Sequence, residues 1–309
     1  MTKFNIPAMK KTILILCAIA CMTSCNNNKG KTGNTFIPLK MIDVPAMITE
    51  PGERSRYIVD HFWKMMNFQD TSYLQNVQNL NVHFSAYVDY LVSANPDAAI
   101  SSVSKLVDSA LNGNPKITSH FRAMFEAAFY SPNSIYRNEE LYIFILEKYL
   151  KSGKYSDSER VQMQYQLDLA YRNRLGTKAI DFKFVLEDGS RKSLYGINSA
   201  YTILMFFDPD CPTCKTVMEE MKVSAILSKM SASVKVLTMY AGVDYERWMK
   251  EVVNLNKKWI NGCDKEMKLS EGPLYDLRPT PAIYLLDKNK IVLLKDAPFK
   301  IIEEYLKKL

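Results

Sequence analysis

The sequence predicts two regions of different fold class, an all-α helical domain over residues 52–175 and an α/β domain over residues 176–309. In the first region, apolar and aromatic residues recur at helical spacing, which indicates amphipathic helices. In the second region, short apolar runs typical of strands alternate with helical segments. Strands that alternate with helices predict an α/β sheet with helices on both faces.

Residues 1–24 are typical of a segment that directs export. Lys3, Lys10 and Lys11 precede the short apolar run 12–20. This run is well below the roughly 20 residues that a membrane-spanning helix needs. The pattern therefore predicts a secretory signal peptide.

Cys25 is the expected lipidation position. Thr23 and Ser24 precede it and a polar Asn run follows it, a pattern that resembles a bacterial lipoprotein signal, in which the cysteine is acylated and becomes the mature N-terminus. Cys21 is the competing position, and cleavage without lipidation is the other alternative. Residues 25–51, rich in Asn, Lys, Gly, Thr and Pro, predict a flexible tether.

About six helical segments follow, separated by short breaks. Pro96, Pro115 and Pro132 fall in the breaks. The aromatic residues at helical spacing predict a helix core rather than a cofactor site. His61 lies on an aromatic-rich segment, where a packed structural histidine is the better interpretation than a catalytic base.

After Gly176 the hydrophobic period changes from that of helices to that of strands. The run DFKFVL and the pair Asp188-Gly189 predict a hairpin, and the apolar run 201–207 predicts a buried central strand. A helix over 212–230, a second buried strand, a crossover helix, a strand pair that begins at Pro281 and a closing helix follow. Residues just after residue 207 therefore lie at the carboxyl end of a central strand, where open α/β sheets place their sites.

A Cys-Pro-Thr-Cys motif stands at this point. Cys211 would open a helix, whose unpaired N–H groups and dipole stabilise a thiolate, so it is the expected nucleophile. Cys214 lies nearly one turn later and can resolve the mixed disulfide that Cys211 forms. Pro212 suits the first helical turn, and Thr213 completes the spacing between the two thiols.

Other chemistry for these cysteines is less well supported. A zinc site would need further ligands, and the three histidines lie far upstream while Cys263 stands alone. Copper binding lacks His or Met partners at an obvious spacing. A small buried residue is the favoured interpretation of Cys263. The sequence therefore predicts no metal and no cofactor beyond a redox-active disulfide between Cys211 and Cys214.

A second stretch supports the redox interpretation. Thr280-Pro281 runs into the apolar strand AIYLLD about 65 residues after the motif. Together, DPDCPTCK and PTPAIYLLD resemble a thioredoxin-superfamily domain, specifically the extracytoplasmic thiol-disulfide oxidoreductases of the TlpA/ResA kind, over roughly residues 176–309. The resemblance implies that Pro281 is cis beside the cysteines and that the backbone of Thr280 binds the extended chain of the substrate. The upstream segment RYIVDHFWKMMNFQDT resembles a helical domain of unknown function that precedes such domains in Bacteroidetes-type lipoproteins.

One residue departs from the pattern of this superfamily. Asp210 replaces the familiar Trp before the first cysteine, and its carboxylate should oppose formation of the Cys211 thiolate. Lys215 is a candidate to balance Asp210, although a solvated helix lysine is the simpler interpretation. The superfamily often has a buried acid near the resolving cysteine, for which the candidates by proximity in sequence are Asp181, Glu219 and Glu220.

These observations predict an exported enzyme, a thiol-disulfide oxidoreductase that is lipid-anchored in the bacterial cell envelope and faces the periplasm. We expect it to reduce protein or peptide disulfides and to need an unidentified electron donor or acceptor. The formal net charge is +7, of which three charges belong to the export segment, and no basic arm with stacking aromatics predicts nucleic-acid binding. The alternative is a protein-interaction lipoprotein whose thioredoxin-like domain is a scaffold or a redox switch.

Overall fold

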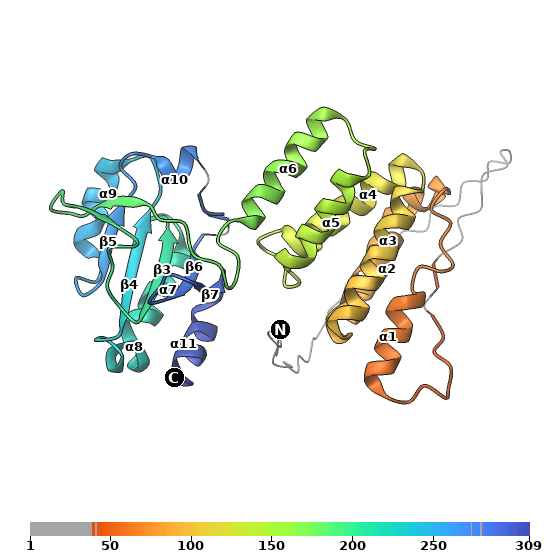
Figure 1. Cartoon of the computed structure of the whole chain (residues 1–309), viewed down its shortest axis with the longest axis horizontal. Coiled ribbons are helices and arrows are strands. Elements are labelled where there is room, and N and C mark those ends of the chain that lie inside the picture. The colour runs from red at the N-terminus through yellow and green to blue at the C-terminus, as the bar shows by residue number, and fades with distance from the viewer. Residues whose placement is uncertain (1–38, 41, 273, 279) are drawn as a thin grey trace, which may run out of the picture. The chain divides into compact units, whose positions relative to one another are not determined.

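The computed structural model describes residues 39–40, 42–272, 274–278 and 280–309, all within one compact unit of the chain, Phe36–Leu309 (Figure 1). The expected signal peptide, the lipidation position Cys25 and most of the expected tether lie outside the described residues. Among the described residues, no helix combines the length and the apolar character that crossing a bilayer would require.

Helices alone make up the first part of the described chain, which we call the helical region. Its elements are α1 Pro51–His61, the 3-10 helix η1 Thr71–Asn76, α2 Val77–Ser93, α3 Pro96–Leu111, α4 Pro115–Phe125, the π-helical turn η2 Glu126–Tyr130, α5 Glu139–Lys151 and α6 Asp157–Tyr171. The first helix begins at the last residue of the expected tether, because a proline with its fixed φ is well suited to the first helical position.

Asn-Pro pairs begin α3 and α4, where the sequence shows breaks. The Asn95 side chain accepts a hydrogen bond from Ala98 N at 2.8 Å, and Pro96 follows in the first turn. Asn114 caps α4 in the same way through Lys116 N at 3.0 Å. Each asparagine pairs an N–H group that the first turn would otherwise leave open.

Aromatic side chains fill the core of the helical region. The rings of Trp63 and Phe121 are 5.1 Å apart and edge to face, and Phe84 and Phe125 contact each other similarly at 5.4 Å. Aromatic pairs favour this geometry because the edge of one ring meets the face of the other. The ring of His61 stacks on Tyr57 at 4.2 Å and bonds its backbone oxygen, which ties this histidine to its own helix.

The second part of the described chain, the sheet region, contains strands and helices. The strands are β1 Lys183–Val185, β2 Arg191–Ser193, β3 Tyr201–Phe207, β4 Val234–Tyr240, β5 Ile260–Cys263, β6 Ala282–Asp287 and β7 Val292–Lys295. The helices are α7 Pro212–Val223, α8 Ala225–Lys229, α9 Tyr245–Glu251, the 3-10 turn η3 Val252–Asn254, α10 Lys268–Glu271 and α11 Phe299–Lys307.

The strands form one mixed sheet in the order β2-β1-β5-β4-β3-β6-β7. The central strand β3 runs parallel to β4 and antiparallel to β6, so that Leu204 lies opposite both Leu237 and Tyr284. Alternate side chains of β3 point to opposite faces, with Ile203 and Met205 in one core and Leu204 in the other. Both faces are buried, which explains the continuous apolar run of this strand.

Three features of the sheet region differ from the sequence prediction. The expected helix over 212–230 is two helices, because Ser224 ends α7 and its Oγ caps α8 through Leu227 N at 3.2 Å. The expected helices on both faces of the sheet are unequally distributed. Helices α7, α8, α9 and α11 pack on one face, whereas the other face is covered by the short α10 and by non-helical segments that include Phe182 and Tyr275. Strand β5, which contains Cys263, was not predicted.

Candidate active site

A tight turn joins β3 to α7 and presents the two cysteines of the motif. Asp208 Oδ1 accepts a hydrogen bond from Asp210 N at 2.8 Å, and Asp208 O accepts one from Cys211 N at 3.1 Å. An aspartate that bonds the backbone two residues ahead makes such a turn locally stable. Cys211 then occupies the N-cap position of α7, with Pro212 in the first turn.

The two thiols have different environments. Cys211 is half-buried, and its Sγ accepts a hydrogen bond from Cys214 N at 3.1 Å. This N–H group and the helix dipole both favour negative charge on the Cys211 sulfur. Cys214 is 1% exposed. Its burial, and next its hydrogen bond with Cys211, raise the pKa of the Cys214 thiol to about 12.

The loop before β6 lies against the first cysteine. The peptide bond Thr280–Pro281 is cis, as the resemblance implied, and the Cys211 thiol donates to Thr280 O at 3.4 Å. The antiparallel pairing of Phe206 with Ala282 brings these segments together from positions 69 residues apart. Thr280 is exposed and Pro281 is half-buried.

An arginine that the sequence did not predict faces Asp210. Arg247 on α9 forms an ion pair with Asp210 through Nη2 and lies 3.9 Å from Asp208 Oδ1. The hydrogen bond with Asp210 raises the pKa of Arg247. Arg247 therefore supplies the balancing charge considered for Lys215. Its position follows from Asp244, which caps α9 through Arg247 N at 2.9 Å.

Two of the three acids considered as partners of the resolving cysteine have their hydrogen bond or ion pair elsewhere, and the third, Glu220, is exposed. Asp181 accepts a hydrogen bond from Tyr195 N at 2.9 Å, and the exposed Glu219 pairs with Lys222. The acid that does act on Cys214 is Asp208: a hydrogen bond with the Asp208 backbone lowers the pKa of the thiol, while the Asp208 charge raises it. Burial remains the larger influence on that pKa.

The remaining positions of the motif and the third thiol lie as follows. Pro212 and Thr213 are exposed in the first turn of α7. Cys263 is fully buried on β5, and burial raises the pKa of its thiol to about 12, which fits a core residue. Within the part of the chain that the structure describes, no three His, Cys, Asp or Glu side chains gather as a metal site.

Comparisons with known proteins support the fold. Residues 20–173 match the family model of a domain of unknown function, DUF5106. The crystal structure of a thioredoxin-like protein from Bacteroides caccae is 34% identical to this chain with a TM-score of 0.83, and the match covers 89% of this chain and 99% of that chain.

Two further solved structures match less than half of this chain. The C-terminal domain of an uncharacterized protein from Bacteroides fragilis is 41% identical, with a TM-score of 0.43, over 44% of this chain and 98% of that chain. A domain of a possible thiol-disulfide isomerase from Cytophaga hutchinsonii is 25% identical, with a TM-score of 0.38, over 45% of this chain and 94% of that chain. A search of curated proteins finds no match.

The match to the Bacteroides caccae protein spans both regions, because its coverage of this chain, 89%, exceeds the length of either region alone. In this chain the helical region precedes a mixed sheet, with Cys211 at the N-cap of α7 and Pro281 directly before β6. The chain belongs to the thioredoxin-like proteins of the Bacteroidetes type, with a helical domain of unknown function ahead of the thioredoxin-like fold.

Proposed function

We propose that this protein is a thiol-disulfide oxidoreductase that reduces disulfides in other proteins or peptides. The observation that carries the proposal is the Cys211 sulfur, which accepts the Cys214 N–H at 3.1 Å and lies 3.4 Å from Thr280 O. A helix N-terminus favours the thiolate that attacks disulfides. The neighbouring backbone at Thr280-Pro281 can bind an extended substrate chain beside that thiolate.

The reaction follows from the different environments of the two thiols. The Cys211 thiolate attacks one sulfur of a substrate disulfide; a mixed disulfide forms, and the other substrate sulfur leaves as a thiolate. Cys214 then loses its proton to solvent or to the leaving group and attacks Cys211 Sγ, which releases the second substrate thiolate. The substrate gains two electrons and the protein is left with a Cys211–Cys214 disulfide.

Burial of Cys214 gives this sequence its order. A thiol with a pKa of about 12 is almost entirely protonated at neutral pH, so Cys214 does not compete with Cys211 for the substrate. A thiol donor of lower potential must reduce the disulfide again before the next turnover. The same thiols run in reverse would oxidise a substrate, and the reduction potential decides the direction.

A trapping experiment tests this function. In Cys214→Ser the resolving thiol is absent, so the mixed disulfide through Cys211 should accumulate and be released by dithiothreitol. The matched control is Cys263→Ser, which removes the other buried thiol and should trap nothing. A reversible couple at about −250 mV or below, as in thioredoxin, would support a reductase, whereas about −120 to −180 mV would indicate oxidation or isomerisation.

No trapped species and no reversible couple would contradict the redox function and favour the alternative of an interaction module.

We also propose that the protein acts in the periplasm and is held to a membrane by a lipid on Cys25. The proposal rests on the export segment and the Thr-Ser-Cys pattern. Labelling with a fatty-acid analogue should mark the wild-type protein and Cys21→Ser but spare Cys25→Ser; label retained in Cys25→Ser would overturn this assignment.

A further inference from the structure

The loop that leads to Thr280-Pro281 is held by a nearly buried carboxylate. The Asp276 side chain is 3% exposed. Its Oδ1 accepts hydrogen bonds from Arg278 N at 3.1 Å and Arg278 Nε at 3.0 Å. The loop is therefore folded on Asp276, two residues before Arg278 and four before the threonine whose oxygen contacts Cys211.

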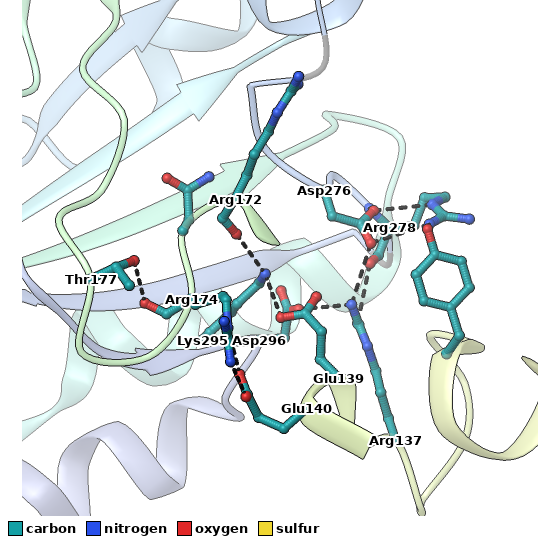
Figure 2. Close-up of polar contacts among 12 residues, drawn as sticks. Arg137, Glu139, Glu140, Arg172, Arg174, Thr177, Asp276, Arg278, Lys295 and Asp296 are labelled. Atoms are coloured by element: carbon teal, nitrogen blue, oxygen red, sulfur yellow. Dashed lines mark hydrogen bonds and ion pairs between the residues drawn. The ribbon is translucent and has the colours of Figure 1, made fainter. Parts of the chain in front are cut away.

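An arginine from the helical region reaches the same loop. Arg137 lies between η2 and α5, and its Nη2 donates to Asp276 Oδ2 at 3.4 Å while its Nη1 donates to Arg278 O at 3.3 Å (Figure 2). The guanidinium is planar, so two donors can bind a carboxylate and a carbonyl oxygen at once. Arg137 thus contacts both a side chain and the backbone of the loop.

Arg137 is itself fixed on the sheet region. Its Nη2 pairs with Asp296 Oδ2 at 3.0 Å, and these side chains are 14% and 12% exposed. Next to this pair, Lys295 Nζ lies 2.7 Å from Glu139 Oε2 and donates to Arg172 O at 3.1 Å, as Figure 2 shows. A half-buried guanidinium with partners on two sides has little freedom to move.

Two other contacts reach the loop from outside the strands. Arg278 lies over the ring of Tyr130 at 4.8 Å and hydrogen-bonds its hydroxyl. The Asn173 side chain donates to Leu274 O at 2.8 Å and accepts from Ile180 N at 2.8 Å. Residues 274–278 therefore contact η2, the segment before α5 and the segment after α6.

We propose that Arg137 is a positioning residue for the substrate-binding loop, so that the helical region sets where Thr280-Pro281 lies beside Cys211. The inference rests on the proposed function. Because Thr280 O is 3.4 Å from Cys211 Sγ and Arg278 O is bonded to Arg137, a displacement of the arginine frees the segment that would bind the substrate backbone. A loop that is no longer held in place binds an extended chain more weakly, because the loop must then be ordered when the chain binds.

The experiment compares two substrates of the prereduced full chain. One is a disulfide-bonded peptide that carries a fluorophore and a quencher, and whose extended chain can bind the loop. The other is 5,5′-dithiobis(2-nitrobenzoic acid), a small disulfide that needs only access to Cys211. In Arg137→Gln, KM for the peptide should rise roughly fivefold or more. The rate with the small disulfide, and the equilibrium constant for exchange with dithiothreitol, should each stay within about twofold of wild type.

Arg174→Gln is the matched control. Arg174 is also an arginine of this neighbourhood, but it pairs with Glu140 rather than with the loop. This control should leave KM for the peptide near the wild-type value. Arg137→Lys keeps the positive charge but lacks the two donor nitrogens of the guanidinium, so its KM for the peptide should lie between those of wild type and Arg137→Gln. If Arg137→Gln does not fold, the KM of Arg137→Lys tests the inference instead.

The outcomes separate this inference from the proposed function. If both substrates slow equally in Arg137→Gln, or if KM for the peptide does not change, Arg137 is only structural and the inference is wrong. If the same KM increase occurs in Arg174→Gln, the effect is not specific to the loop and the inference is equally wrong. A wild-type protein that reduces neither substrate would instead overturn the proposed function.

Discussion

The turn that carries the cysteines and the charge network that holds the Asp276 loop are built in opposite ways. The hydrogen bonds of the turn join residues two to four positions apart, such as Asp210 N to Asp208 Oδ1. The network joins Arg137 to Asp276 across 139 residues and Lys295 to Glu139 across 156. Local structure thus sets the position of Cys211, whereas the loop before Thr280 also has contacts with the helical region.

The largest expected effect concerns the turn that carries the cysteines. Cys211→Ser replaces the nucleophile by a hydroxyl that does not ionise near neutral pH, so disulfide reduction should fall by about a thousandfold or more. Stopped-flow assays with the small disulfide would measure it. Thermal unfolding should change little, because Cys211 is only half-buried. Activity within about tenfold of wild type would show that the local thiol is not the nucleophile.

The next largest effect concerns the charge network that holds the Asp276 loop. Asp276→Ala leaves Arg137 and Arg278 without their shared carboxylate, so the free energy of unfolding should fall by about 3–5 kcal/mol. Urea unfolding of the two proteins at pH 7 measures the difference. The control is Asp157→Ala at an exposed first-turn position of α6, expected within about 1 kcal/mol of wild type. Equal effects of the two substitutions would mean that the network contributes no stability of its own.

The network should also have its own pH dependence. Burial raises the pKa of Asp296 to about 6, against the attraction of Arg137 and Lys295 and with the repulsion of Glu139 and Asp276. A carboxyl whose folded pKa is raised binds its proton more tightly in the folded state. It therefore stabilises the protein below its unfolded pKa near 3.8, and that contribution is lost as pH rises to about 6.

Asp296→Asn removes this titration. Relative to wild type, the variant should become more stable by about 2–3 kcal/mol as pH rises from 4 to 7. Urea unfolding at a series of pH values measures the difference between the two curves. Asp188→Asn in the exposed β1–β2 turn is the control and should not show this rise. Parallel curves for Asp296→Asn and wild type would show that the carboxylate is not held at a raised pKa.

The smallest effect belongs to the exposed pair beside the nucleophile. Arg247→Gln leaves the Asp210 carboxylate unbalanced next to Cys211, so alkylation of Cys211 by iodoacetamide at pH 7 should slow by about twofold. The difference should shrink at 1 M salt, since exposed charges are screened over about 3 Å there. Lys250→Gln on the same helix is the matched control. A rate unaffected by either substitution would exclude Arg247 from the electrostatics of the site.

Much of the candidate site was predictable because the signals for it lie within short stretches of sequence. A strand that ends at Phe207, an aspartate turn and a proline after Cys211 each favour the same local structure, and the spacing of the cysteines follows from the helix. The fold class was predictable for the same reason, since periodicity is a property of each segment. The division of the expected helix at Ser224 was missed because a single serine cap is a weak signal.

Arg247 and Arg137 were not predictable as partners of the site. Each is an arginine among many charged residues, and nothing in the neighbouring sequence distinguishes it from a solvated side chain. Their partners are Asp210, 37 residues upstream of Arg247, and Asp276, 139 residues downstream of Arg137. Only chain folding brings such pairs together, and their energies depend on burial, which sequence spacing does not reveal.

The sequence by itself therefore determined the fold class, the placement of the two cysteines at the start of a helix, and the likeness that indicated Pro281 beside them, because local propensity and motif spacing are properties of short segments. The tertiary structure alone decided that Arg247 balances Asp210 and that Arg137 of the helical region bonds the loop before Thr280. The physical reason is that burial and distance set the strength of an ion pair, and both arise only when distant segments pack together.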